Sequence, residues 1–411
     1  MKTRPLKNPH ARWAAPPWAA VALAALGALA GPSVAATFIT TDRTVAGGNA
    51  INGNYSGQGV FVGVNAAFTR VNNVQVDVID PAQLNYSDQT GGGLAAYSNS
   101  VVNIRGGSFG QYSPTGCCGG AWANDTSRLN ISGGTLDSLS LNGAAAGAAG
   151  AQANVSGGLI QNYRRSVAVV ANGVLNVSGG TISSSAGQPA MVGDVGGVIN
   201  ISGGLVQSVS GAAIIASSGS ALSMSGGTVS GLASRAFGVV LDNASATADL
   251  HGGTINGGLR ADRYGASAPA LQATLSGGLT LNGGAFALRD AALDISGGTF
   301  TAYAGSDAQF FALGSNNLNF YGNGLALSGP TAGSVFMDYN YGGNFYTFTA
   351  GTFTGGQSAV GLRLFDALSF AGSTAGMGGS FTLTTAVPEP GQWAMLLLAL
   401  PLLGWRMARQ R

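Results

Sequence analysis

The fold is decided by the stretch Asn176-Val177-Ser178-Gly179-Gly180-Thr181-Ile182. Apolar residues alternate up to Val177, since Leu175 is apolar too, and the next one, Ile182, comes five positions later. Alternation of this kind predicts a β-strand with one buried face. A Gly-Gly pair permits backbone angles that other residues avoid, so it suits a sharp corner. The stretch therefore predicts a strand, a glycine corner and a second strand.

The same stretch recurs along the middle of the chain. The first glycines of successive copies are 20 to 27 residues apart, with a mean of about 24. A repeat of this length, without leucine-rich or helical patterning, predicts an all-β fold, a right-handed parallel β-helix solenoid with about 24 residues per coil. The first glycine of each copy is Gly106, Gly133, Gly157, Gly179, Gly203, Gly226, Gly252, Gly277 or Gly297.

A small polar residue precedes the central apolar position in every copy. Stacked at about 4.8 Å, such side chains can hydrogen-bond from coil to coil. We therefore expect an outward polar column, beside an inward column that includes Ile131, Val177, Ile201 and Ile295. The polar positions are Asn103, Asn130, Asn154, Asn176, Asn200, Ser223, Asp249, Thr274 and Asp294.

The first 36 residues have the composition of a secretory signal peptide. A basic segment of residues 1–12 is followed by an apolar run from Trp18 to Ala30 and by the small residues Ser33-Val34-Ala35-Ala36. This order is typical of a segment that is cleaved during export. We expect cleavage after Ala35 or Ala36.

The last 25 residues carry a second signal. Val387-Pro388-Glu389-Pro390 precedes an apolar run from Trp393 to Gly404, and the chain ends with Arg406, Arg409 and Arg411. From Trp393 to Trp405 there are 13 residues, whereas about 20 are needed to span a bilayer core. The segment predicts a short hydrophobic helix, which we treat as a transient transmembrane helix.

In these three parts and their order, residues 387–411 resemble the PEP-CTERM sorting signal of Gram-negative bacteria. The resemblance implies that an exosortase, a membrane transpeptidase, reads the tail, while signal peptidase removes the leader. It also implies an address at the cell surface or in the exopolysaccharide of a biofilm matrix. It says little about the activity of the protein that is sorted.

Removing both ends changes the charge of the chain. Residues 37–386 contain 11 arginines and 15 aspartates but no lysine or glutamate, so their formal net charge is −4 rather than the +2 of the whole sequence. A mildly acidic, lysine-free region lacks the basic surface that nucleic acids require. We expect no nucleic-acid partner.

The composition shifts after Phe300. Of the chain's 33 aromatic residues, 15 lie between positions 300 and 370. The segment from Tyr339 to Tyr346 predicts a hairpin with its turn at Gly342-Gly343. Solenoids need their open ends covered, so we interpret residues 301–386 as an aromatic-rich β cap on a β-helix of residues 37–300. The alternative is an aromatic surface that stacks on sugars.

Candidate catalytic groups are few. Parallel β-helices often carry polysaccharide lyases and hydrolases, and glycoside hydrolysis needs two carboxyl groups about 5 to 9.5 Å apart. Without glutamate the pair must be aspartates, and the strongest candidates are Asp249 and Asp262, with His251 as the sole histidine of residues 37–386. No motif for a metal ion or cofactor is found. Cys117 and Cys118 are adjacent; they can form a vicinal disulfide, cross-link two chains or act in redox chemistry.

These observations favour a secreted, non-enzymatic structural protein that contacts exopolysaccharide through its polar outward face. The first alternative is a carbohydrate-active enzyme, a lyase or hydrolase, that uses aspartates on the β-helix. The second is a surface-layer protein that associates with its own copies.

Overall fold

In the residues that the computed structural model describes, every regular element is a β-strand. None of these residues belongs to a helix long and apolar enough to cross a membrane. The described residues are 37–45, 59–80, 83–84, 93–109, 120–143, 150–162, 166–185, 187–233, 236–242, 245–262, 271–288, 291–304, 306–313, 317–336, 340–370 and 380–385.

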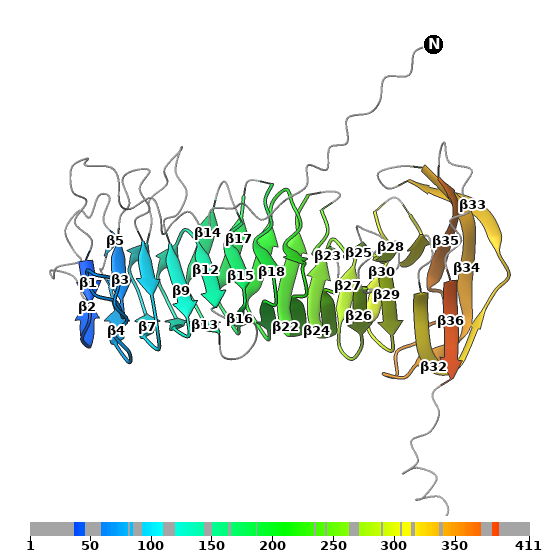
Figure 1. The fold of residues 1–411 in the computed structure, drawn as a ribbon. Helices are drawn as coiled ribbons and strands as arrows, with labels where there is room; N and C mark the ends of the chain where they lie inside the picture. Colours follow the sequence, from blue (N-terminus) through cyan, green and yellow to red (C-terminus); the bar gives the residue numbers. More distant parts are fainter. Residues whose placement is uncertain are drawn as a thin grey trace, which may run out of the picture. The chain divides into compact units, whose positions relative to one another are not determined.

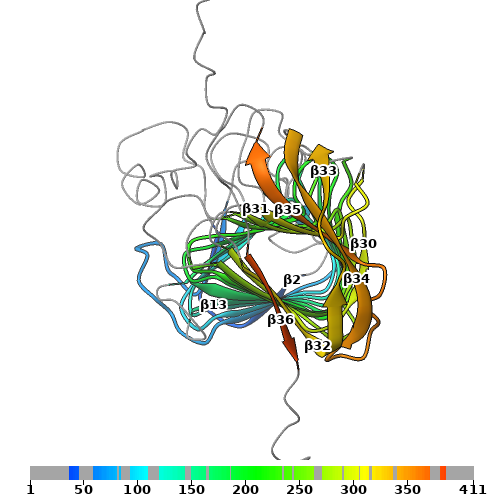
Figure 2. The ribbon, with the colours of Figure 1, turned by 90° about the vertical axis from the view of Figure 1, so that its right-hand side faces the viewer.

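The strands form a parallel β-solenoid, which confirms the all-β class and the repeating parallel coils of the prediction (Figure 1). The coils with the glycine corner make about nine turns of about 24 residues. The coils stack their strands into three groups, which we call sheets A, B and C. Viewed along the stack, the strands surround a common interior (Figure 2).

Sheet B contains the strand before the glycine corner, sheet C contains the strand after it, and sheet A closes the coil. Sheet A consists of β1 (Thr37–Ile39), β3 (Val60–Val62), β6 (Leu94–Ala96), β9 (Ala121–Asp125), β12 (Leu139–Gly143), β15 (Ala168–Ala171), β18 (Met191–Asp194), β21 (Ile214–Ala216), β23 (Val239–Asp242), β25 (Leu259–Asp262), β28 (Ala285–Leu288), β31 (Phe310–Leu313) and β35 (Arg363–Phe370). Sheet B consists of β2 (Arg43–Val45), β4 (Gln75–Val78), β7 (Val101–Ile104), β10 (Arg128–Ile131), β13 (Ala151–Val155), β16 (Gly173–Val177), β19 (Val198–Ile201), the first halves of β22 (Ala221–Gly231) and β24 (Thr247–Asn256), β26 (Leu271–Leu275), β29 (Ala291–Ile295), β32 (Asn317–Leu327) and β36 (Ser380–Thr385). Sheet C consists of β5 (Gln83–Leu84), β8 (Ser108–Phe109), β11 (Thr135–Leu136), β14 (Leu159–Asn162), β17 (Thr181–Ser184), β20 (Leu205–Ser208), the second halves of β22 and β24, β27 (Thr280–Asn282) and β30 (Thr299–Thr301).

The two glycines of the corner are required for different reasons. A Cβ on the first glycine, as at Gly203, would lie 2.3 Å from the carbonyl oxygen of Ser178 in the preceding coil. The second glycine has a positive φ, +78° at Gly204 and +74° at Gly180, which side chains other than glycine rarely adopt. Steric contact between coils and backbone conformation together account for the repeated pair.

The interior is a continuous apolar column. Ile131, Val177, Ile201 and Ile295 are at most 1% exposed, and the strand registers stack them in one line with the residues between them. The inward column is therefore as predicted. Burial of apolar surface is the main favourable term that holds the coils together.

Parallel stacking continues past Phe300. Strands β31 and β32 add to sheets A and B, and β35 and β36 add again. Between them lie the antiparallel strands β33 (Thr331–Phe336) and β34 (Asn340–Phe353). The aromatic residues of this part mainly pack inside, with exposures of at most 1% at Phe310, Phe320, Phe348, Phe353 and Phe365.

The predicted turn at Gly342-Gly343 is wrong. Both glycines lie inside strand β34, and the chain reverses between β33 and β34 instead. A Cβ on Gly343 would lie 2.1 Å from the carbonyl oxygen of Asp366 in β35, and the register shifts between Gly342 and Gly343. The pair therefore allows a β-bulge and a close strand contact rather than a turn.

Several predictions concern residues outside the described ranges. These are the signal peptide of residues 1–36 with Ala35 and Ala36, the pair Cys117 and Cys118, and the sorting segment 387–411 with Val387, Pro388, Glu389, Pro390, Arg406, Arg409 and Arg411.

Candidate functional site

Asp249 and His251 lie on strand β24, on the outward side of sheet B. Their side chains are two residues apart and point the same way, with 3.7 Å between Asp249 Oδ2 and His251 Nδ1. Both are open to solvent, with side-chain exposures of 61% and 45%. An exposed pair of this kind is strongly hydrated, and solvent weakens its electrostatic interaction.

Asp262 lies on another sheet, at the end of strand β25 in sheet A. Its side chain is 6% exposed and forms an ion pair with Arg260, with 2.5 Å between Oδ2 and Nη2. The neighbour of Asp262 in the preceding coil is Asp242, at the matching position of strand β23. The structure thus pairs Asp262 with Asp242 and Arg260, and it places Asp249 and His251 on a different sheet.

The outward polar column of sheet B is present as predicted. Five asparagines in successive coils form a chain of side-chain hydrogen bonds, in which each Nδ2 donates to Oδ1 of the preceding coil at 2.8 to 2.9 Å. Asn103 donates in turn to Asp77 at 2.6 Å. We call this set the asparagine column; it consists of Asn103, Asn130, Asn154, Asn176 and Asn200.

The asparagine column keeps hydrogen-bonding capacity toward the outside. An amide has two N–H groups and two acceptor lone pairs, and the column uses one of each within the stack. The side chains are half-buried, and the serines two positions later, such as Ser156, Ser178 and Ser202, are exposed. From Asn130 to Asn200, sheet B therefore offers a donor, an acceptor and a hydroxyl in each coil, repeated at the strand spacing of about 4.8 Å.

A second polar column on sheet C was not expected. Asn256 Nδ2 donates to Ser230 Oγ and Asn282 Nδ2 donates to Asn256 Oδ1, both at 2.9 Å. It occupies later coils, where the asparagine column has given way to Ser223, Asp249 and Thr274. The sequence contained an indication of this column, because Asn256 and Asn282 each lie a similar number of residues after the Gly-Gly corner of their coil.

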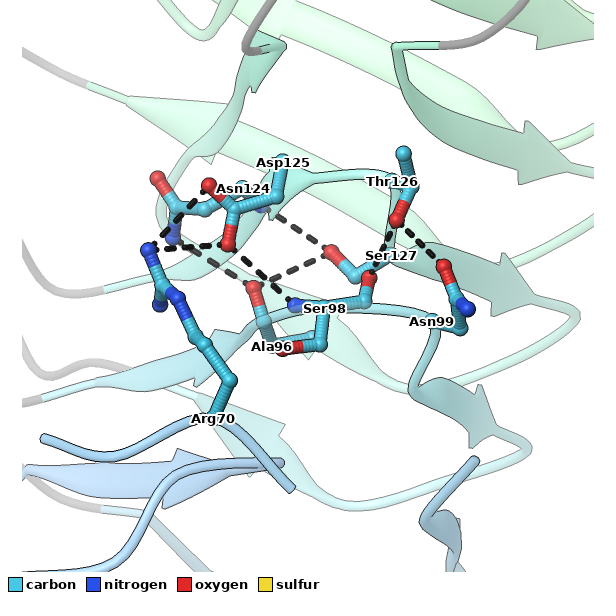
Figure 3. A network of polar contacts seen from close by, with 8 residues as sticks. All are labelled: Arg70, Ala96, Ser98, Asn99, Asn124, Asp125, Thr126 and Ser127. Atoms are coloured by element: carbon cyan, nitrogen blue, oxygen red, sulfur yellow. Dashed lines mark hydrogen bonds and ion pairs between the residues drawn. The ribbon is translucent and has the colours of Figure 1, made fainter. Parts of the chain in front are cut away.

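The corner between sheets A and B near the N-terminal end holds a network of polar contacts (Figure 3). The Arg70 guanidinium forms an ion pair with Asp125, with 3.0 Å between Nη2 and Oδ2, and lies 4.8 Å from the centre of the Tyr97 ring. Thr126 Oγ1 donates to Asn99 Oδ1 at 2.5 Å. Burial, the largest cause, and the charge of Asp125 raise the pKa of Tyr97, while the Arg70 charge opposes them, so the phenol stays protonated at neutral pH.

Aromatic rings adjoin this network on the outward side of sheet A. Phe38 and Phe61 stack with 5.3 Å between ring centres, and Phe61 and Tyr97 stack at 6.4 Å. Phe68 packs edge-on against both Phe38 and Phe61, at 5.8 and 5.7 Å. The sequence predicts an aromatic surface only after Phe300, and it does not indicate the N-terminal cluster, because Phe38, Phe61 and Tyr97 are far apart in sequence.

One carboxyl group has a markedly altered acidity. Burial raises the pKa of Asp137, which follows strand β11, from 3.8 to about 6. Such a pKa suits a general acid.

In the described part of the chain, no group of three or more His, Cys, Asp or Glu side chains could hold a metal ion. Comparison of the chain with protein-family models, curated proteins and solved structures gives no match.

Proposed function

We propose that the protein is a secreted structural component of a cell surface or biofilm matrix, and that it contacts exopolysaccharide without cleaving it. The observation that carries the proposal is the outward face of sheet B. From Asn130 to Ser223 its polar column has no charged member, and it repeats donors and acceptors in every coil.

This chemistry matches a sugar polymer. Sugar hydroxyl groups both donate and accept hydrogen bonds, as the amides of the asparagine column and the flanking serines do. Single contacts of this type are weak, because each replaces a hydrogen bond to water. A regular row of them gains strength from multivalency once the first contact is made.

Export and sorting are part of the same proposal. Signal peptidase removes residues 1–36, and an exosortase-type transpeptidase processes the tail that begins at Val387. The support is the order of basic, apolar and small residues at the first end and of the Pro-Glu-Pro motif, apolar run and arginines at the second. The chain is then located at the cell surface or in the extracellular matrix.

Two details of the fold belong to the proposal. The coil is right-handed, the hand found for nearly all parallel strand crossovers. Residues 301–386 act as a cap, since β33 and β34 pair antiparallel at the end where parallel stacking stops. A cap blunts the sheet edges that would otherwise pair with other chains.

A carbohydrate-active enzyme is the second candidate, supported by Asp242 and Asp262. Their Cα atoms occupy paired positions on neighbouring parallel strands, about 4.8 Å apart, so their carboxyl groups can reach the separation of about 5 Å that a retaining pair needs. The ion pair between Asp262 and Arg260 weakens this reading, because the guanidinium already occupies an oxygen of the Asp262 carboxylate.

The two candidates differ in whether a product forms. The purified full chain is incubated with exopolysaccharide from the producing cells between pH 5 and 9. We expect retention on the polymer and no new reducing or unsaturated ends. Release of such ends that is abolished in Asp262→Asn or Asp242→Asn, with an unchanged melting curve, would establish the enzyme instead.

A further inference from the structure

Phe68 is an exposed aromatic residue held in an unusual conformation. It is 44% exposed, although its ring packs edge-on against Phe38 and Phe61. Its φ is +55°, a region that bulky residues rarely enter. Edge-on packing against two rings leaves part of the Phe68 ring surface to solvent.

The loop around Phe68 is fixed by its own hydrogen bonds. Asn65 Oδ1 accepts from the backbone N–H groups of Ala67 and Thr69 at 3.0 and 2.9 Å, and Asn65 O accepts from the N–H of Phe68 at 2.8 Å. A β-bridge between Val64 and Arg70 closes the loop. These contacts hold the Phe68 loop in one conformation before a ligand binds, so binding costs little conformational entropy.

Polar groups with balanced charge connect to Phe68 through the aromatic rings, since the Arg70 guanidinium lies over Tyr97 and Tyr97 stacks on Phe61, against which Phe68 packs. Arg70, two residues from Phe68, is paired with Asp125, and their side chains remain 48% and 28% exposed. Asn99 and Thr126 continue the polar edge through their mutual hydrogen bond. The edge offers donors and acceptors without a net charge from the ion pair.

We propose that Phe68, Arg70 and Asp125 form a subsite for a neutral sugar residue of a glycan. The C–H face of a pyranose ring complements the negative face of an aromatic ring, and its hydroxyl groups suit an edge with both donors and acceptors. An acidic sugar is disfavoured, because Arg70 is already neutralised by Asp125 and residues 37–386 carry a net charge of −4. This subsite rests on the proposed function, for which it names the sugar class and one contact point.

The test measures binding of the full chain to cellohexaose, maltohexaose, mannohexaose and hexagalacturonic acid by titration calorimetry. We expect at least one neutral hexasaccharide to bind, and hexagalacturonic acid to bind more weakly. Phe68→Ala should weaken the neutral ligand about tenfold, and Phe68→Tyr should stay within about twofold of wild type. The matched control is Leu232→Ala, which removes another exposed apolar side chain, 55% exposed, far along the sequence; it should leave binding unchanged.

Three results would overturn the subsite. The first is unchanged binding by Phe68→Ala with an intact melting curve, which would leave the proposed function standing if the wild type still binds the producing cells' exopolysaccharide. The second is tighter binding of hexagalacturonic acid than of every neutral ligand. The third is a dimer in sedimentation that Phe68→Ala dissociates, which would assign the ring to a second copy of the chain. Failure of the wild type to bind both the hexasaccharides and the exopolysaccharide would overturn the subsite and the proposed function together.

Discussion

Replacing Ile201 with aspartate should destabilise the solenoid by about 4 kcal/mol. Ile201 is 1% exposed and stacks between Val177 and Met224 in adjacent coils. A carboxylate at this position has no partner in the apolar column, so it must be buried as a charge or take up a proton at a cost. Urea unfolding followed by circular dichroism measures the loss.

The control for this prediction is the neighbouring residue. Asn200→Ala removes one half-buried side-chain hydrogen bond, to Asn176 at 2.8 Å, and should cost about 1 kcal/mol. If Asn200→Ala proved the more damaging of the two, the assignment of inward and outward columns would be wrong.

Gly203→Ala should cost about 3 kcal/mol, because it forces two coils apart. The new Cβ would lie 2.3 Å from the Ser178 carbonyl oxygen, and a backbone atom cannot move aside as a flexible side chain can. The expected result is a lower unfolding midpoint in urea and increased proteolysis near the corner.

Gly219→Ala is the matched variant without the steric contact. Gly219 has a φ of +76°, and an added Cβ would meet no atom within 4 Å. Only the conformational cost of about 1 kcal/mol applies. Equal destabilisation by Gly203→Ala and Gly219→Ala would mean that coil spacing does not depend on the first glycine of the corner.

Much of sheets B and C could be predicted because the two features that define them lie next to each other in the sequence. The Gly-Gly pair marks the corner, and the alternation before it separates inward residues such as Val177 from outward ones such as Asn176. The same reasoning failed at Gly342-Gly343, where the pair lies within a strand. A corner and a β-bulge both need glycine for steric reasons, so a Gly-Gly pair in the sequence does not distinguish one from the other.

The inward and outward faces of sheet A could not be predicted from alternation. Several of its strands are apolar on both faces, as in Val239-Val240-Leu241, so alternation in them does not show which side faces inward. The structure places Val169, Val192, Ile215 and Val240 in one outward, half-buried column. Continuous apolar runs are typical of strands that are buried on both faces, which explains why the pattern gives no orientation.

The aromatic and polar groups around Phe68 were also beyond prediction. Phe38, Phe61, Tyr97 and Asp125 come from different coils, and the variable loops between early coils hide their register. Contact between them depends on the strand pairing of β1, β3, β6 and β9. The sequence predicted glycan contact through the repeated polar face of the solenoid, but it did not indicate a single contact point such as Phe68.

The proposed contact between the asparagine column and exopolysaccharide can be tested by comparing two double variants. Asn154→Ala with Asn176→Ala interrupts the column on sheet B, whereas Asn256→Ala with Asn282→Ala removes the same chemistry from sheet C. Retention of each full-length variant on immobilised exopolysaccharide from the producing cells is measured under conditions where both remain folded. We predict about a tenfold loss for the sheet B variant and retention at the wild-type level for the sheet C variant. Equal retention by all three proteins, or an equal loss in both variants, would contradict the account.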